Sequence, residues 1–367
     1  MHIIHCTSSH KRSSSRIFYR LCNSCAKYNL QTSLIISDGL GNDCINGIQI
    51  YSLKNYKNIY AKILILPFLI FLKCLRTPAN IYHLHDPELV PIGFLLKFFG
   101  KKVIFDMHEN IHLQILSRNS IKPKIFRKFL SKISRLVENI FLLFLDGLTV
   151  PQPIMVDMYK NKNKNIISIC NFYMGDKINC GEDKFIEKDF KSLIYAGNIS
   201  IPRGFINMLN LMREMPDGYT LNVAGTISKE LLNKIPKSIN KKIIVHGYLS
   251  QKELIKLYKR CGVGLIMFNN VGQYYMSYSL KLFEYMHYGL FIILPNFGEW
   301  QKFNTLYKVG VNVNVTNPKE CAFYIKNNTR KNFLRVSQNN IKTEASKFIW
   351  NLEEKKLINY YKKICSS

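Results

Sequence analysis

The chain has 367 residues, which fits about two domains of ordinary size and excludes a small module held together by disulfides or metals. Hydrophobic residues make up 47% and charged residues 21%, with 19 Gly and 12 Pro, so neither intrinsic disorder nor a collagen-like repeat fits this composition. The net charge of +28 implies anionic partners, such as nucleotide phosphates, an acidic membrane surface or nucleic acid.

The N-terminal segment, MHIIHCTSS, lacks the basic and then apolar pattern of a signal peptide, so we expect a cytoplasmic protein. The longest apolar run, residues 63–72, is too short for a membrane-spanning helix, which needs about 20 residues. Among the 10 cysteines, only Cys22 and Cys25 have a spacing found in metal or redox sites. Both fall inside an expected helix, which favours packing residues over a reactive thiolate.

Short segments rich in β-branched residues alternate with helical patterns along the chain. Strands are expected at residues 3–6, 33–36, 48–52, 81–85 and 103–107 and, after a polar stretch at 174–191, at residues 193–196, 221–224, 243–246, 264–268, 291–294 and 311–315. Such alternation is typical of parallel sheets with helices on both faces. The sequence therefore predicts two doubly wound α/β domains.

Polar side chains follow two successive strands of the first domain. His85 and Asp86 come after one strand, and Asp106, His108 and Glu109 come at the end of the next. Doubly wound sheets bind ligands beyond the carboxyl ends of their strands, so these turns are candidate site residues. A single histidine or carboxylate in such a turn is commonly a capping residue, but two pairs on successive strands indicate a functional site.

These turns and several segments of the second half resemble a family 4 glycosyltransferase over nearly the whole chain. In the first half the resemblance rests on residues 16–18 (RIF), 46–50 (NGIQI), 85–91 (HDPELVP) and 105–109 (FDMHE). In the second half it rests on Gly197 followed by 202–204 (PRG), on 281–289 (KLFEYMHYG), and on Trp350, Glu353 and Glu354 with 357–361 (LINYY).

The resemblance implies the GT-B fold, in which two Rossmann-like, doubly wound parallel-sheet domains face each other across a cleft. The expected boundaries are 1–175 for an acceptor-side domain and 176–345 for a nucleotide-sugar domain, with a helix at 346–367 that crosses back to the first domain. The implied activity is retaining transfer of a hexosyl or N-acetylhexosaminyl group from a nucleotide diphosphate sugar to a glycan or polyprenyl-linked acceptor, in bacterial surface polysaccharide assembly.

The resemblance assigns Gly197, Arg203, Lys281 and Glu284 to the donor. Arg203 and Lys281 would act in catalysis by facing the diphosphate, where negative charge grows as the glycosidic bond breaks. Gly197 belongs to the diphosphate-binding turn. Glu284 lies one helical turn after Lys281, so a carboxylate there could accept hydrogen bonds from ribose hydroxyls. A solvated turn arginine and an ordinary helix-surface ion pair are the alternatives that spacing alone leaves open.

In the first domain, His108 and Glu109 are expected to orient the sugar and the acceptor, and Asp86 is a further candidate for holding the acceptor hydroxyl. Neither a resident cofactor nor a metal is expected, because enzymes of this class use side chains and helix ends in place of a metal ion. The chain departs from the family pattern at Asn198, where many relatives carry Arg, at Met276, where a second glutamate is usual, and at residues 7–15, which lack the frequent pair of glycines.

Other functions stay open at this point. A nucleotide-sugar epimerase of the GT-B class would use the same donor site without an acceptor. Nucleic-acid binding is suggested by charge alone, and no recognisable motif accompanies it, so we expect no nucleic-acid partner. Residues 122–145 place apolar side chains at helical spacing with Lys and Arg between them. They fit a buried helix with a solvated basic side and, equally, a helix on the anionic inner face of the plasma membrane.

Overall fold

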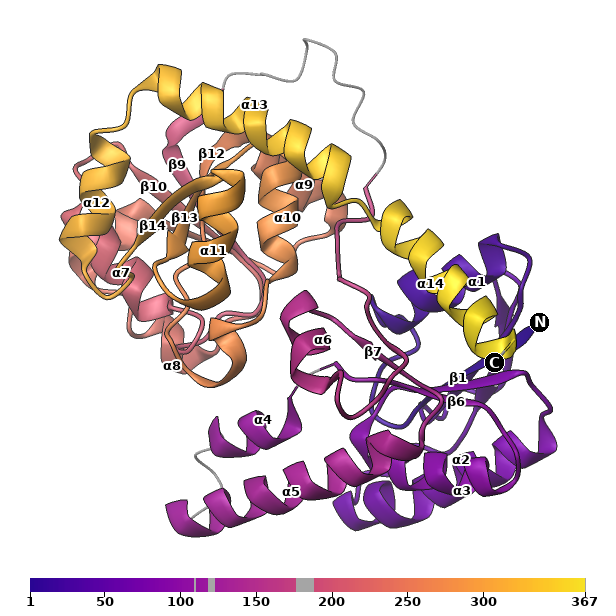
Figure 1. Cartoon of the computed structure of the whole chain (residues 1–367). Helices are drawn as coiled ribbons and strands as arrows, with labels where there is room; N and C mark the ends of the chain where they lie inside the picture. The colour runs from indigo at the N-terminus through magenta and orange to yellow at the C-terminus, as the bar shows by residue number, and fades with distance from the viewer. Residues whose placement is uncertain (109, 118–122, 176–187, 367) are drawn as a thin grey trace. The chain divides into compact units, whose positions relative to one another are not determined.

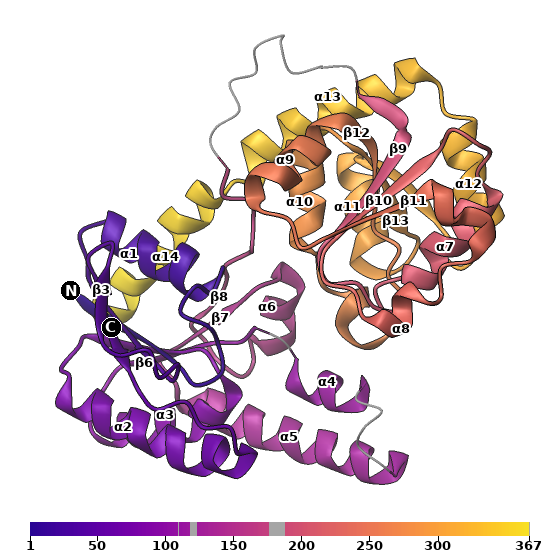
Figure 2. The ribbon, with the colours of Figure 1, turned by 180° about the vertical axis from the view of Figure 1, so that it is seen from behind.

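The computed structural model describes residues 1–108, 110–117, 123–175 and 188–366, and they form two compact units (Figure 1). Unit 1 runs from Met1 to Asn171 and includes the C-terminal segment from Trp350 onwards. Unit 2 runs from Phe172 to Ile349. Each unit contains one β-sheet with helices on both of its faces, as the two opposite views show (Figures 1 and 2).

The sheet of unit 1 has eight strands in the order β3-β4-β2-β1-β5-β6-β7-β8, and only the β3–β4 pair is antiparallel. The strands are β1 (His2–Thr7), β2 (Gln31–Ile36), β3 (Asp43–Ile45), β4 (Ile48–Ser52), β5 (Ile81–Leu84), β6 (Val103–Asp106), β7 (Gly147–Val150) and β8 (Ile166–Ser168). The strand order reverses its direction at β1, which pairs with β2 on one side and β5 on the other. Doubly wound sheets bind ligands at such a reversal, beyond the carboxyl ends of the strands.

Two sets of helices cover the sheet of unit 1. The helical segments are η1 (Ile17–Cys22), α1 (Asn23–Lys27), η2 (Ala61–Ile65), α2 (Leu66–Arg76), η3 (Pro87–Leu89), α3 (Val90–Phe98), α4 (Ile111–Ser117), α5 (Lys124–Phe144), α6 (Pro153–Tyr159) and α14 (Trp350–Ser366). Residues of α2, α3, α5 and α6 share one apolar cluster with the sheet, and α14 shares another with β1, β5 and β6. Trp350 Nε1 donates to Ser24 Oγ at 3.0 Å, and Glu353 accepts the backbone N–H of Cys170 at 2.6 Å, so α14 is anchored within unit 1.

The sheet of unit 2 has six parallel strands in the order β11-β10-β9-β12-β13-β14. The strands are β9 (Asp189–Ala196), β10 (Thr220–Ala224), β11 (Ile243–Gly247), β12 (Cys261–Leu265), β13 (Phe291–Pro295) and β14 (Gly310–Val313). The helical segments are α7 (Phe205–Glu214), α8 (Lys229–Leu232), η5 (Lys237–Lys242), α9 (Gln251–Arg260), η6 (Gly272–Tyr275), α10 (Leu280–His287), α11 (Gly298–Tyr307), α12 (Pro318–Lys326) and α13 (Arg330–Lys347). Here the strand order reverses at β9, between β10 and β12.

The expected strands match observed ones, with differences in short or glycine-rich segments. The sequence missed β3, β7 and β8, which have three or four residues each and give too little pattern to recognise. Strand β12 begins at Cys261 and ends at Leu265, whereas the sequence placed it at 264–268. Glycine is uncommon in strands, so the glycines of β12 gave no strand pattern at its start. An added Cβ at Gly262 would lie 2.5 Å from Phe190, and one at Gly264 would lie 2.5 Å from Tyr285, so packing requires them.

Cys22 and Cys25 are buried in the helical segment formed by η1 and α1, as the sequence predicted. Burial raises the pKa of the Cys22 thiol well above its usual value, which opposes thiolate chemistry.

Candidate functional site

In unit 2, two glycines allow the backbone to approach other groups closely at the carboxyl end of β9. Gly197 follows the strand with a φ of 117°, and an added Cβ would lie 2.9 Å from Nζ of Lys281. Gly204 has a φ of 84° and precedes α7, and an added Cβ would lie 1.8 Å from the carbonyl oxygen of Met267. Glycine is therefore required at both positions by conformation and by space. The 197–204 turn packs directly against the ammonium group of Lys281.

Lys281 is a buried cation in the first turn of α10. Its side chain is 5% exposed, and Nζ lies over the rings of Tyr195 at 4.7 Å and Phe268 at 5.5 Å. Within the described part of the chain, Nζ makes no hydrogen bond and has no carboxylate within 4.0 Å. Burial and the nearby Arg203 lower the pKa of Lys281 to about 7, although Glu284 opposes the change. A buried ammonium beside a second cation, with no carboxylate in direct contact among the described residues, is a position that an anion would stabilise.

Arg203 lies beside Lys281, and the two share Tyr195 as a neighbour. Arg203 Nε donates to Tyr274 Oη at 3.4 Å. Burial alone would lower the pKa of Arg203, but interactions with Tyr274 and Tyr195 raise it, so the guanidinium stays charged. The N-termini of α7 and α10 are adjacent to these two side chains in sequence, and amide groups at helix N-termini also favour anions. The side chains of Arg203 and Lys281 and the N-termini of α7 and α10 thus lie at the carboxyl ends of the strands of unit 2.

Glu284 is half-buried and lies one turn after Lys281 on α10. Its Oε2 accepts a hydrogen bond from Tyr258 Oη at 2.9 Å. Burial and the Glu284 carboxylate raise the pKa of Tyr258 well above its usual value, so the hydroxyl stays a donor. The sequence pattern does not reveal Tyr195, Tyr258 and Tyr274 as partners of the donor-site residues, because their spacing from those residues follows no motif.

In unit 1, the most connected side chain is Asp106, fully buried at the end of β6. Its carboxylate accepts hydrogen bonds from Arg16 at 2.6 and 2.8 Å, Thr149 at 2.7 Å, His108 at 2.8 Å and His85 at 3.1 Å. Burial by itself would raise the pKa of Asp106, but Arg16 and His108 outweigh it and hold the pKa well below its usual range. Because an ionised carboxylate only accepts hydrogen bonds, the facing nitrogens of His85 and His108 are both N–H donors.

The hydrogen bonds continue from Asp106 into the interior through two histidines. Burial lowers the pKa of His85 to about 3, so this ring is neutral, and its Nε2 is an acceptor once Nδ1–H faces Asp106. His5 Nδ1 lies 2.9 Å from His85 Nε2 and must be the donor. The parallel pairing of β1 with β5 places His5 opposite His83, which brings three histidines to one part of the sheet. No local sequence pattern indicates a role for Arg16, His5 or His83.

His108 is the member of this chain of hydrogen bonds that reaches solvent, with 20% of its side chain exposed. Its ring stacks on His10 with the centroids 4.7 Å apart. Asp86 holds the loop that carries His10: Oδ2 accepts from Thr7 Oγ1 at 2.6 Å and from the backbone N–H of Ser8 at 2.8 Å. Asp86 and His108 are thus connected indirectly, because Asp86 holds the loop whose His10 stacks on His108. Glu109 lies outside the described residues.

Among the described residues of unit 1, two groups of side chains have ligand atoms close enough to hold a metal ion: three histidines, His5, His83 and His85, and the set His85, Asp106 and His108. In the first group both nitrogens of His83 already have partners, Tyr361 and Thr149. In the second, the Asp106 oxygen that faces both histidines also accepts from Arg16 Nε. A cation there would face a guanidinium across one oxygen atom. The donor set therefore fits hydrogen bonding better than metal binding.

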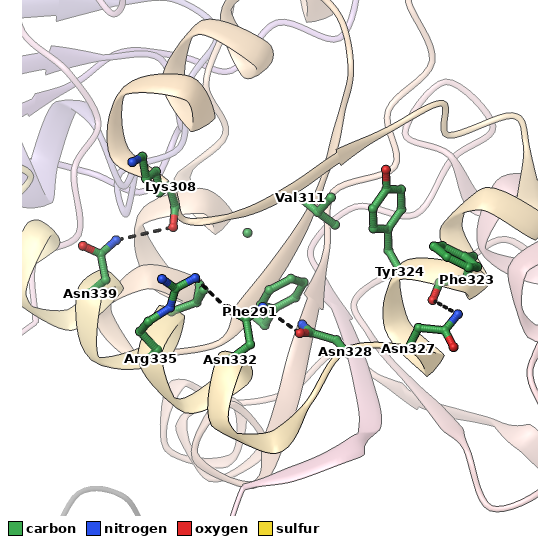
Figure 3. A pocket seen from close by; sticks show the side chains of 12 residues that line it. Phe291, Lys308, Val311, Phe323, Tyr324, Asn327, Asn328, Asn332, Arg335 and Asn339 are labelled. Carbon is green, nitrogen blue, oxygen red and sulfur yellow. Dashed lines mark hydrogen bonds between the residues drawn. The ribbon is translucent and has the colours of Figure 1, made fainter.

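Unit 2 also has a hollow of about 680 Å³ at the opposite strand ends, where β13 and β14 begin (Figure 3). Phe291, α12 and α13 line it. Its polar groups largely bond to one another: Arg335 donates to Asn332 at 2.8 Å, and Asn332 donates to Asn328 at 2.6 Å. It contains none of the candidate residues, and ligands of doubly wound sheets bind at the other strand ends, so we do not place the site here.

Comparison with solved structures identifies the fold. Sucrose-phosphate synthase from Thermosynechococcus elongatus aligns with a TM-score of 0.78 at 13% identity, covering 100% of this chain and 99% of the other. HepE from Anabaena, in complex with UDP-glucose, aligns with a TM-score of 0.74 at 10% identity, covering 99% and 100%. Trehalose-6-phosphate synthase, studied as an enzyme of glycosyltransfer with retention, aligns with a TM-score of 0.71 at 12% identity, covering 98% and 99%.

The chain has the GT-B fold. The prediction of an α/β protein built from two Rossmann-like parallel-sheet domains is confirmed. No protein-family model and no curated protein matches the sequence. At 10–13% identity these neighbours establish the fold alone, because one fold can carry many activities.

Proposed function

We propose that this protein is a retaining glycosyltransferase of the family 4 type, which uses a nucleotide diphosphate sugar as donor. The observation that carries the proposal is the buried ammonium of Lys281, which has no carboxylate within 4.0 Å in the described part of the chain and packs against Gly197 beside Arg203. A diphosphate supplies the missing negative charge. The structural neighbour HepE, with its bound UDP-glucose, supports this class of donor.

In the proposed reaction, the bond between the anomeric carbon and the diphosphate oxygen breaks while the acceptor oxygen bonds to the same carbon on the same face. The acceptor proton moves to the leaving phosphate oxygen, so no separate base is required. Arg203 and Lys281 stabilise the charge that develops on the diphosphate, and this stabilisation is larger in the transition state than in the ground state. Glu284 binds ribose hydroxyls. We infer no essential metal, because these two cations and the helix ends provide the positive charge.

The residues of unit 1 are assigned to the sugar and the acceptor. His108 presents one ring nitrogen to a substrate hydroxyl. Nε2–H donates to the ionised Asp106, so Nδ1 is the ring nitrogen that is left to face the substrate. Asp86 is proposed to hold the acceptor hydroxyl through the loop after β1, and Glu109 is proposed to act with His108.

The acceptor is proposed to be a glycan or a polyprenyl-linked sugar, in assembly of a bacterial surface polysaccharide, with hexosyl or N-acetylhexosaminyl transfer. A polyprenyl-linked acceptor is held in a bilayer by its apolar chain, so with that acceptor the enzyme would work as a peripheral protein on the inner face of the plasma membrane. The basic composition supports this location, because that face carries anionic lipid.

A direct test combines donor binding with transfer. Nucleotide sugars are screened by thermal shift, since a ligand that binds only the folded state raises the melting temperature. Hits are then tested for transfer to lipid-linked acceptors, with Lys281→Met as the test variant and Lys252→Met, on the surface of α9, as the control. Donor-dependent stabilisation and transfer that Lys281→Met alone abolishes would support the proposal. Product formation without any acceptor would instead indicate an epimerase.

A further inference from the structure

One face of unit 1 exposes many large apolar side chains. Among the described residues, six on 59–68, four on 94–99 and nine on 125–144 are exposed. Phe98 is 85% exposed, Ile125 80% and Tyr60 72%. Single exposed apolar residues are ordinary, but a contiguous patch of this kind on a water-soluble domain marks an interaction site.

Ring contacts link α2 to the end of α3 and link α3 to α5. Phe94 of α3 lies 5.2 Å from Phe144 of α5, measured between ring centroids, and Phe71 of α2 lies 5.8 Å from Phe99. Both views show α2, α3 and α5 along the same side of unit 1 (Figures 1 and 2). We call the exposed apolar side chains of residues 59–68, 94–99 and 125–144 the apolar face.

The charge around the apolar face has one sign. Residues 59–76, 90–99 and 123–144 contain nine Lys or Arg and a single acidic residue, Glu138. Glu138 is buried and accepts a hydrogen bond from Tyr159 at 2.9 Å, so it faces inward. Lys128, Lys132 and Arg135 are exposed between the apolar positions of α5.

We propose that the apolar face docks unit 1 onto an anionic phospholipid bilayer, with its apolar side chains inserted below the headgroups and its basic residues against lipid phosphates. The helices would lie in the plane of the membrane, since within the described ranges none has both the length and the apolar character to cross it. Charge favours lipid over a second copy of the chain, because face-to-face association would bring two basic surfaces together.

This inference deepens the proposed peripheral location. Its assay contains neither donor nor acceptor, so a failure of membrane binding and a failure of the proposed sugar transfer are seen separately. Binding of the full chain is measured by sedimentation with phosphatidylcholine vesicles, with and without phosphatidylglycerol. We expect binding only with phosphatidylglycerol, and weaker binding at high salt.

Two variants separate the contribution of the basic residues to vesicle binding from that of apolar insertion. Lys128→Ala/Lys132→Ala/Arg135→Ala should weaken binding about a hundredfold, since each such residue contributes roughly a fivefold factor. Phe98→Ser/Leu136→Ser should weaken it even at low salt, because insertion no longer occurs. The matched controls are Lys241→Ala/Lys252→Ala/Lys259→Ala and Leu40→Ser/Leu306→Ser, all at exposed positions outside the face, and both should bind like the unmodified chain.

A fluorescence probe tests insertion itself. The two natural tryptophans, Trp300 and Trp350, are buried, so Phe98→Trp adds the exposed reporter. Its emission should shift to shorter wavelength on vesicles and be quenched by brominated acyl chains. Absence of quenching, or equal weakening by the control variants, would overturn the proposal. So would dimers in solution that the Phe98→Ser/Leu136→Ser variant dissociates, since the face would then be an interface between two copies.

Discussion

Nucleotide-sugar binding should weaken as the pH rises above 7, because Lys281 then loses its proton. Burial and Arg203 lower its pKa to about 7 in the free protein, and a bound diphosphate should return it toward the ordinary value of about 10.5. The difference corresponds to about 5 kcal/mol of interaction between the ammonium and the anion, as an upper limit. The buried position makes this coupling much stronger than that of a surface lysine.

The expected size follows from linkage between proton and ligand binding. Affinity should be constant below the free pKa and fall about tenfold per pH unit above it, which gives about a thirtyfold loss between roughly pH 6 and pH 8.5. Binding should take up about half a proton near pH 7 and about 0.9 near pH 8. Isothermal titration calorimetry of UDP-glucose in buffers of different ionisation enthalpy measures this uptake directly. The diphosphate of a nucleotide sugar is a diester, so its own charge does not change in this range.

Two variants and a measurement of the unfolding free energy make the result specific to Lys281. Lys281→Arg keeps its charge, and Lys281→Met has none, so donor affinity should be independent of pH in both, and lower in Lys281→Met. The stability of the free protein should change with pH in the opposite direction to donor affinity. Between about pH 7 and 10.5, Lys281 is protonated in the unfolded chain but largely neutral in the folded one. The unfolding free energy of the unmodified chain should therefore rise with pH relative to that of Lys281→Met. A wild-type binding enthalpy that is the same in every buffer at pH 8 would refute this reasoning.

Three further results are expected. Arg203→Ala should lower kcat about a hundredfold, as loss of a preorganised charge contact does, whereas Glu284→Gln should mainly raise the donor KM, by roughly tenfold. Steady-state kinetics on folded protein measures both parameters, and equal behaviour of the two variants would contradict the assignment. Transfer should persist in excess EDTA, and complete loss restored by magnesium or manganese would show that a metal is required. Asp106→Asn should destabilise unit 1 by about 3–5 kcal/mol in urea unfolding, because it leaves the buried Arg16 without its counter-ion, whereas Asp86→Asn, which keeps its loop hydrogen bonds in part, should cost less.

The amino-acid sequence by itself determined the architecture and the edges where the candidate residues lie. Local patterns cover only a few positions, and they indicate the strand segments, the polar turns after the strands and Gly197. The signals are the periodicity of apolar residues and the residue types in the turns. The amphipathic pattern of residues 122–145 was equally visible, and α5 occupies Lys124–Phe144. The shortest strands, the polar start of β9 and the glycine-rich start of β12 were missed, because local propensity carries little information there.

What the sequence left open depends on partners that lie far apart along the chain. Arg16 meets Asp106 across 90 positions, and His5 meets His85 across 80, because parallel pairing through β1 and β5 brings them together. The pKa of Lys281 follows from burial beside Arg203, which no local pattern specifies. Likewise, 122–145 fitted a buried or a membrane helix equally well. In the structure, most of the apolar side of α5 remains exposed although Phe144 contacts Phe94 of α3, and the sequence could not show this because burial is a property of neighbours in space and not of neighbours in sequence.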